Sequence, residues 1–395
     1  MDFINEANLI KEKVIQHRRY FHMNPELSGL EFNTAGKISE VLETLGIEIA
    51  HQIGAPLPGV VGLLRGSEPG PTVALRADMD ALKQQERREN PYKSLIDGVM
   101  HGCGHDAHMA IQLGAAEILS RHRDELKGNI KFIFQPSEEI NGGAVPMICD
   151  GVLNDPTVDA IFGLHVDGSF QTGQVALSYG ETMASSDRLI IHIRGKSTHA
   201  AYPHEGVDAI IIAAHVLVAL QSLISREKDA FYPAVLSFGV IEGGKQPNAI
   251  CEDVLIRGIL RTLNPDTREL LIRRVEETIS FITKAFNGGY EFIREKSYDS
   301  LINNDQMVNL QKEICRKIIG EDHIRFLTRA RMITEDFAYY LQKVPGAMLF
   351  LGTGNILKDT ELPLHNSSFD IDEDALAVGV AIQTALAWEY LKNNQ

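Results

Sequence analysis

The sequence predicts a two-domain α/β protein in which a small α+β domain is inserted into a larger metal-binding domain. Three observations lead to this prediction. The chain has 395 residues, more than the size at which one hydrophobic core usually keeps growing. Apolar strands alternate with helical patterns near both ends of the chain, which is typical of a sheet covered by helices. Between these parts, strands and helices follow the order β-α-β-β-α-β.

In the first part, apolar residues at helical spacing indicate helices, and short apolar runs bounded by turn residues indicate strands. The expected elements are helices over 5–22 and 34–45, strands over 60–66 and 72–80, a helix over 107–122, and strands over 129–135 and 161–166. Asp78 and Asp80 end the second strand at alternate positions and so face the same side. Ligands gather outside strand ends in α/β proteins, so we expect Asp80 to contact a site or its ligands. The alternative is an aspartate that starts a turn.

The middle of the chain predicts a ferredoxin-like domain. Its expected elements are a strand over 187–196, a helix over 207–225, strands over 234–244 and 249–263, a helix over 265–286 and a strand over 290–298. We place this inserted domain at 184–296 and the discontinuous domain at 1–183 and 297–395. The last part returns to helix, strand and helix, over 306–319, 347–354 and 372–391.

Composition excludes several classes of protein. The formal net charge of −15 is spread along the chain, which argues against nucleic acid or an anionic membrane as a partner. The four cysteines are far apart and form no CxxC pair, which indicates a reducing compartment. The N-terminal segment has no hydrophobic signal core, and no run of eighteen apolar residues occurs. We therefore expect a cytoplasmic protein.

The stretch MHGCGHDAHMA has the features of half a metal site. Cys103 and His105 are two residues apart and flanked by glycines, which lets a loop direct both side chains toward one point. The alternative is a loop whose histidines are incidental. His101 and His108 could also bind metal chemically, but their spacing does not direct them to the same point as this pair. Asp106 could cap the helix or orient a ligand.

Other candidate ligands follow strands of the same domain. The full set is Cys103, His105, Glu139, His165 and His365. Five ligands are too many for one tetrahedral ion, whereas two ions that share a ligand and a water would use them all. Glu138 could then act as the general base for that water. Zinc or manganese is expected, with cobalt or nickel as alternatives. Cys103 as a nucleophile is the rival chemistry, but His105 is poorly placed to take its proton.

Several stretches of the sequence resemble those of a known family. The stretches that carry the resemblance are RADMDAL, GVMHGCGHDAHMA, FQPSEE, FGLHV, HAAYPH and EDFAYYLQKVPGA. They resemble the M20 metallo-amidohydrolases, in particular the branch that hydrolyses N-acyl-amino acids, hippurate and auxin conjugates. The resemblance runs nearly end to end and implies a dinuclear site with the five ligands named above and Glu138 as base. It departs at DALKQQERRENPYKSLIDG and at Ile333–Thr334, near the expected pocket walls.

The resemblance also implies roles for the inserted domain. It implies that His199, in KSTHAAYPH, reaches an active site from a lid and polarises the scissile carbonyl, and that Asn248 contacts substrate. The helix over 207–225 is apolar around nearly its whole circumference, although a helix on one face of a sheet needs a single apolar stripe. We therefore expect a homodimer through the inserted domain.

The expected function is hydrolysis of the amide bond of an N-acyl-L-amino acid, with that small molecule or a short peptide as the partner. The alternative enzyme is a metallo-dipeptidase or carboxypeptidase, which would share every metal ligand and differ in the acyl-side pocket. A metal-dependent binding protein without turnover is the alternative from another class, and the intact Glu138 counts against it.

Overall fold

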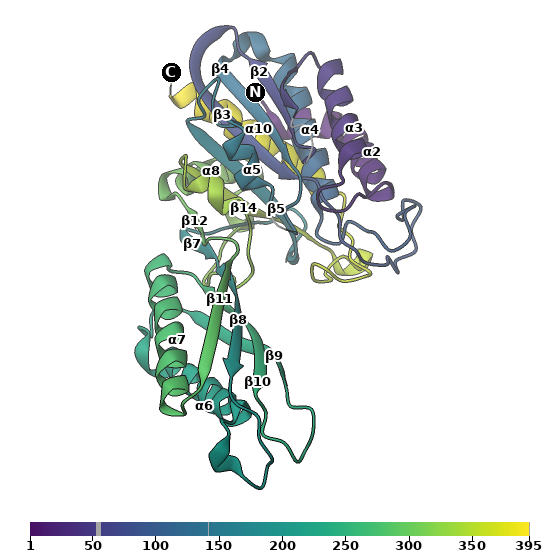
Figure 1. Ribbon diagram of the computed structural model, residues 1–395. Coiled ribbons are helices and arrows are strands. Elements are labelled where there is room, and N and C mark those ends of the chain that lie inside the picture. The colour runs from purple at the N-terminus through teal and green to yellow at the C-terminus, as the bar shows by residue number, and fades with distance from the viewer. Residues whose placement is uncertain (53–56, 141, 395) are drawn as a thin grey trace. The chain divides into compact units, whose positions relative to one another are not determined.

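The computed structural model describes residues 1–52, 57–140 and 142–394, and it divides into two compact units (Figure 1). The larger unit comprises Met1–Gly180, Ile302–Thr328 and Tyr339–Gln395, and the smaller comprises Glu181–Leu301 and Arg329–Ala338. The smaller unit thus interrupts the larger one in sequence. Residues 329–338, which the sequence predicts in the larger domain, lie in the smaller unit, and the exact domain boundaries stay a prediction.

An eight-stranded mixed sheet forms the centre of the larger unit, in the order β1-β2-β4-β3-β5-β14-β6-β13. The strands are β1 (Glu48–Gln52), β2 (Val60–Arg65), β3 (Glu68–Asp78), β4 (Lys127–Gln135), β5 (Ala160–Gln171), β6 (Val175–Leu177), β13 (Ile324–Phe326) and β14 (Gly346–Gly354). Strands β4, β3, β5 and β14 are parallel neighbours. Their near-continuous apolar runs fit strands that are buried on both faces.

Helices cover this sheet. They are α1 (Phe3–Leu9), α2 (Lys11–Met23), α3 (Phe32–Thr44), α4 (His105–Arg121), α5 (Ala144–Cys149), α8 (Asp305–Ile319), α9 (Ala338–Leu341) and α10 (Ala375–Asn393). Helices α4 and α10 pack on each other and on β3, and α3 packs on β1 and β2. Four predictions need correction. The single helix expected over 5–22 is two helices separated at Ile10, and α4 begins at His105 rather than Ala107. The strand expected over 161–166 continues to Gln171, and the strand expected over 249–263 begins at Asp253.

The smaller unit has the predicted order β-α-β-β-α-β. Its main elements are β8 (Ser185–Arg194), α6 (Ala209–Ser222), β9 (Ala234–Gly243), β10 (Asp253–Thr262), α7 (Pro265–Ala285) and β11 (Gly289–Lys296). The strands form an antiparallel sheet in the order β11-β8-β10-β9. Alternate residues of β8, which are Leu189, Ile191 and Ile193, are fully buried in the core shared with α6 and α7. Asn264 caps α7 through the backbone N–H of Thr267, as its position before Pro265 predicts.

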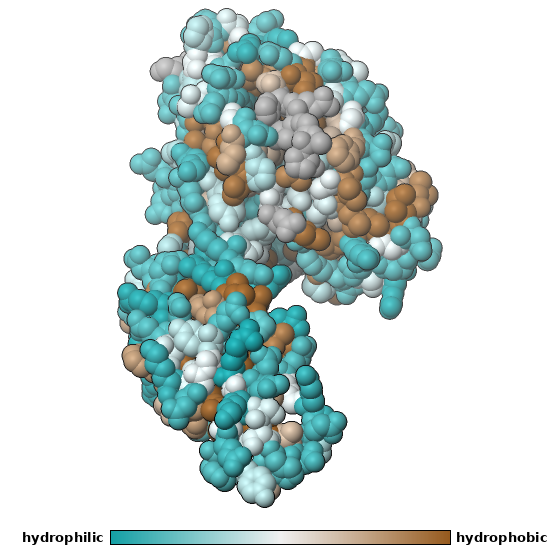
Figure 2. All heavy atoms as spheres, viewed as in Figure 1, coloured by the Kyte–Doolittle hydropathy of each residue, from teal (hydrophilic) through white to brown (hydrophobic). Residues whose placement is uncertain are grey.

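Helix α6 is more apolar than its position requires. Its inner residues Ile212, Val216 and Leu220 are fully buried, whereas Ile211 and Val218 are 46% and 76% exposed. By length and composition alone, Ala209–Glu227 could also cross a membrane, although it contains no run of eighteen apolar residues. A helix that covers a sheet in a folded domain passes the same test. On the face shown in Figure 2, hydrophilic residues cover much of both units, and several hydrophobic patches lie among them on the larger unit.

Candidate metal centre

The candidate ligands lie where the parallel strands of the larger unit end. In the sheet, β3 lies between β4 and β5. The chain therefore adds β4 on one side of β3 and the next strand, β5, on the other, so the direction of strand addition reverses at β3. A reversal of this kind opens a crevice at the carboxyl ends of the strands. Cys103 and His105 come from the start of α4, Glu138 and Glu139 follow β4, and His165 lies in β5.

The turn between Cys103 and His105 depends on Gly104. This glycine has a φ of +86°, which is left-handed, and a Cβ added to it would overlap the side chain of Val166. Because of this turn, the chain enters α4 with both side chains directed inward. Cys103 is 7% exposed and His105 is fully buried. The geometry that the sequence predicted for this pair is present.

The rings of His105 and His165 are held in similar ways. Nδ1 of His105 lies 2.9 Å from the main-chain oxygen of Asp80, and Nδ1 of His165 lies 2.7 Å from that of Val166. A carbonyl oxygen only accepts, so each Nδ1 donates a proton to it, and each Nε2 is the ring nitrogen that can bind metal when it is deprotonated. Nε2 of His105 is buried without a hydrogen-bond partner in the described part of the chain. Nε2 of His165 lies 3.6 Å from Sγ of Cys103.

Glu139 and His365 complete the predicted set. Oε1 of Glu139 lies 3.1 Å from Nε2 of His365. His365 has a φ of +63°, which is uncommon for a residue with a side chain, and its backbone N–H donates to the oxygen of Gly102. The long loop between β14 and α10 is thus fastened beside Cys103.

The donor atoms form two groups that share Cys103. One group is Cys103, His105 and His165, the other is Cys103, Glu139 and His365, and within each the donor atoms lie within 4.8 Å of one another. Burial and the carboxylates of Glu139, Glu138 and Asp78 raise the pKa of the Cys103 thiol well above its ordinary value. Burial lowers the pKa of His105, but Asp78, Asp80 and Glu139 outweigh it and raise that pKa to about 10. Carboxylates contribute to both shifts, and divalent cations would neutralise their negative charge, so the donor set fits two metal ions.

Asp80 joins three parts of the site, as the sequence analysis expected of it. Its carboxylate accepts from the hydroxyl of Ser28 at 2.6 Å and from the backbone N–H groups of Glu138 and Glu139 at 3.1 and 2.9 Å. Its pKa is lowered despite its burial, because His105, Ser28 and the N–H of Glu139 stabilise the ionised form. Asp80 therefore positions both glutamates and one histidine.

Asp78 and His108 form a pair that sequence reasoning missed. Nδ1 of His108 lies 2.6 Å from Oδ1 of Asp78, and Nε2 of His108 accepts the N–H of Val166 at 2.9 Å. Although Asp78, His105 and His108 could hold an ion by proximity, both ring nitrogens of His108 are already engaged. We assign this pair to the support of His165, whose ring centre lies 4.6 Å from that of His108.

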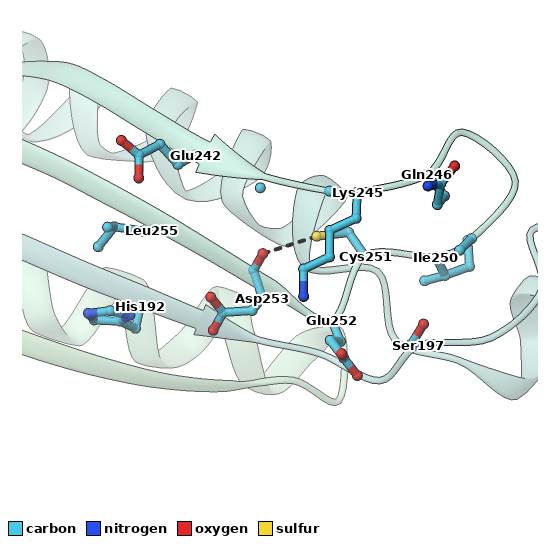
Figure 3. A pocket seen from close by; sticks show the side chains of 13 residues that line it. His192, Ser197, Glu242, Lys245, Gln246, Ile250, Cys251, Glu252, Asp253 and Leu255 are labelled. Atoms are coloured by element: carbon cyan, nitrogen blue, oxygen red, sulfur yellow. Dashed lines mark hydrogen bonds between the residues drawn. The ribbon is translucent and has the colours of Figure 1, made fainter.

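In the smaller unit, His199 and Asn248 lie on neighbouring loops. The N–H of Ala200 donates to the main-chain oxygen of Asn248 at 2.9 Å, and Nδ1 of His199 accepts the N–H of Ala201. Gln246 and Ala249, on either side of Asn248, line a pocket of 540 Å³ with His192 and Lys245 (Figure 3). The structure brings these two predicted residues together within the smaller unit, and their catalytic roles stay predictions.

The sequence profile of peptidase family M20/M25/M40 matches residues 74–389. The chain belongs to this family. The M20 membership expected from the sequence is therefore confirmed, and with it the class of reaction, metal-dependent hydrolysis of amide bonds.

Three M20 relatives illustrate the similarity. The chain is 38% identical over 389 residues to thermostable carboxypeptidase 1 of Saccharolobus solfataricus, covering 98% of this chain and 97% of the relative. It is 38% identical over 375 residues to the N-acetyl-L-cysteine deacetylase of Bacillus subtilis, covering 94% and 87%. The crystal structure of the Bacillus subtilis YXEP protein, described as a dinuclear metal binding peptidase, superposes with a TM-score of 0.85 at 32% identity, covering 98% of this chain and 99% of that one.

Proposed function

We propose that this protein hydrolyses the amide bond of N-acyl-L-amino acids with two divalent metal ions and Glu138 as the general base. The observation that carries the proposal is the placement of Glu138 and Glu139. Both backbone N–H groups are fixed on Asp80, and carboxylate oxygens of the two residues lie within 4.8 Å of each other and of a ring nitrogen of His105. One glutamate can thus bind metal while its neighbour faces the substrate.

The chemistry divides between the ions and the chain. Bound at this site, two divalent ions would acidify a water and polarise the scissile carbonyl. The five proposed ligands, which are Cys103, His105, Glu139, His165 and His365, would hold them. Glu138, which is 6% exposed, accepts the proton of the attacking water and returns it to the leaving amine nitrogen, so that the base is regenerated in each cycle.

We propose zinc or manganese as the metal, with cobalt or nickel as alternatives. A thiolate favours zinc, and the carboxylate and imidazoles also suit the other three. The YXEP protein is described as dinuclear, which supports two ions here. Metal analysis of the purified protein identifies the element.

The competing function is that of a dipeptidase or carboxypeptidase, which the name of the Saccharolobus relative suggests. The deacetylase relative favours the acyl amino acid. Rates on N-acetyl-, N-benzoyl- and indolyl-acyl-amino acids, measured beside simple dipeptides, decide between them. We expect a higher kcat/KM for an acyl amino acid, and a preference for dipeptides would contradict the proposal. No turnover with any of these substrates would favour a binding protein.

We propose that the protein is a homodimer through its smaller unit. Strand β9 is an edge strand, and the groove between it and α6, with a volume of 330 Å³, is lined by Leu217, Val218, Phe238 and Ile241. An exposed apolar face beside an unpaired strand edge is a surface that a second copy can cover by two-fold symmetry. The occupant proposed here is a second copy of this chain.

We further propose that His199 polarises the scissile carbonyl and that Asn248 contacts substrate. The support is their common location on two loops joined by a backbone hydrogen bond, beside a pocket. Mixing inactive Glu138→Gln and His199→Ala proteins tests whether His199 serves its own subunit or its neighbour.

We propose a cytoplasmic location. The cysteines Cys103, Cys149, Cys251 and Cys315 are all free. Free thiols persist in reducing compartments, where a thiolate ligand also remains available to metal.

A further inference from the structure

The residue before the two glutamates has an unusual backbone conformation. Ser137 has a φ of +63°, in the left-handed region that residues with a Cβ seldom adopt. It is 4% exposed, and its hydroxyl donates to the oxygen of Ile140 at 2.9 Å. Conformations of this kind persist only where the surroundings hold them, and they concentrate at functional sites.

A carboxyl group from the N-terminal part of the chain holds this turn. Oε1 of Glu31 accepts the backbone N–H of Ser137 at 2.8 Å, across 106 positions of sequence. Glu31 is fully buried, and its Oε2 has no hydrogen-bond partner among the described residues. Burial and the neighbouring carboxylate of Asp80 raise the pKa of Glu31 to about 7. Burial of a carboxyl group beside another carboxylate lowers the free energy of unfolding, so stability alone does not explain Glu31 at this position.

Helix capping does not explain Glu31 either. Glu31 precedes α3, but its side chain makes no cap hydrogen bond. Glu26 caps the helix instead, since its carboxylate accepts the backbone N–H groups of Asn33 and Thr34 at 3.2 and 2.8 Å. The Glu31 carboxyl group also interacts with the backbone N–H groups of Glu31 and Gly29, and its hydrogen bond to a distant part of the chain is the one to Ser137.

We propose that Glu31 is a positioning residue that holds Ser137 in its left-handed turn and so sets the direction in which Glu138 and Glu139 enter the metal site. The inference rests on the roles proposed above for these two glutamates. Asp80 accepts the backbone N–H groups of both glutamates, and Glu31 accepts that of the residue before them. Loss of a group that orients a metal ligand typically costs tenfold to a hundredfold in metal affinity or activity.

The test compares substitutions of Glu31 by two readouts, metal binding to chelator-treated protein by calorimetry with Zn²⁺ and kcat of the metal-saturated enzyme. Glu31→Leu removes the acceptor, and we expect metal affinity and kcat each to fall at least tenfold. Glu31→Gln keeps an acceptor oxygen and should stay within threefold of wild type on both readouts. Adding Ser137→Gly to Glu31→Leu should recover part of both losses, because glycine adopts the turn without support.

Glu26→Ala is the matched control. It removes a carboxylate from the same loop and should lower the Tm while leaving metal affinity and kcat unchanged. Wild-type binding and kcat in Glu31→Leu, or an equal loss in Glu26→Ala, would overturn the proposal. If Glu31→Leu does not fold, Glu31→Asp replaces it, because the shorter side chain withdraws from Ser137; equal behaviour of the Asp and Gln variants would then refute the role.

A parallel Glu139→Gln variant separates this inference from the proposed function. If Glu139→Gln binds metal as tightly as wild type, the proposed ligand role fails. If it binds weakly while Glu31→Leu binds normally, only the role of Glu31 fails.

Discussion

Nε2 of His365 lies 3.1 Å from Oε1 of Glu139, although 226 positions separate the two residues in sequence. The His365 side chain is 53% exposed and that of Glu139 is 12% exposed. The histidine therefore approaches the site from the solvent side, and the glutamate belongs to its buried wall.

This relationship predicts a selective defect for His365→Ala. Loss of a group that only orients a ligand usually costs about tenfold to a hundredfold in metal affinity. Loss of the ligand His365 itself should cost more than that. The free energy of unfolding of metal-free protein should change by less than about 0.5 kcal/mol, as for other exposed positions. Calorimetric metal titration and urea unfolding measure the two. His122→Ala is the control. It removes a partly exposed histidine that is paired with Glu125, and it should leave metal affinity unchanged.

Cys103 should be protected from thiol reagents by metal. Coordination occupies the sulfur lone pair. In chelator-treated protein the sulfur is free to react, although Cys103 is only 7% exposed. We expect faster alkylation of Cys103 after chelation, measured by peptide mass spectrometry, with the exposed Cys149 as an internal reference. Equal rates at Cys103 with and without metal would count against ligation.

His101 should make the protein acid-sensitive. It is buried, and neither ring nitrogen has a hydrogen-bond partner in the described residues. Burial lowers its pKa to about 3. The folded state therefore keeps it neutral while the unfolded chain takes up a proton below about pH 6.5, so stability falls as the pH falls between about 6.5 and 3.

The slope for one such proton is about 1.4 kcal/mol per pH unit. Between about pH 7 and pH 5, metal-free wild type should therefore lose about 2 kcal/mol more unfolding free energy than His101→Asn, which cannot titrate. Urea unfolding at the two pH values measures the difference. Identical pH dependence of the two proteins would show that His101 is protonated in the folded state.

Mixing two inactive proteins tests whether subunits share a site. If His199 acts on the neighbouring subunit, a heterodimer of Glu138→Gln and His199→Ala has one site that lacks both groups and one that lacks neither. Activity should then reappear on mixing. No recovery despite demonstrated subunit exchange would restrict His199 to its own chain, and an active monomer in sedimentation would contradict the dimer itself.

The sequence predicts most of the fold because periodicity is local. The strands over 60–66 and 129–135 and the helix that Asn264 caps are found where apolar spacing and cap residues place them. The break at Ile10 was missed because no glycine or proline marks it and the apolar spacing continues through it. The start of α4 was placed two residues late because Gly104 turns the chain directly into the helix.

The donors of the metal centre were predictable because their chemistry is rare. Cys103 and His105 lie at a helix start and Glu139 follows a strand, whereas His165 lies within β5 and His365 in the loop between β14 and α10. Their supporting groups were not predictable. His108 pairs with Asp78, Ser28 with Asp80 and Glu31 with Ser137, over 30, 52 and 106 positions. Nothing local in the sequence distinguishes such residues from ordinary core or loop positions, because their partners are set by the packing of distant elements.

The most direct test of the account is the Glu138→Gln variant, with metal content and kcat measured on the same preparation. The amide keeps the shape of the side chain and removes the base, so the account predicts wild-type metal content and a kcat lower by about 10²–10⁴. A variant that retained more than a tenth of the wild-type kcat with its metal intact would contradict it.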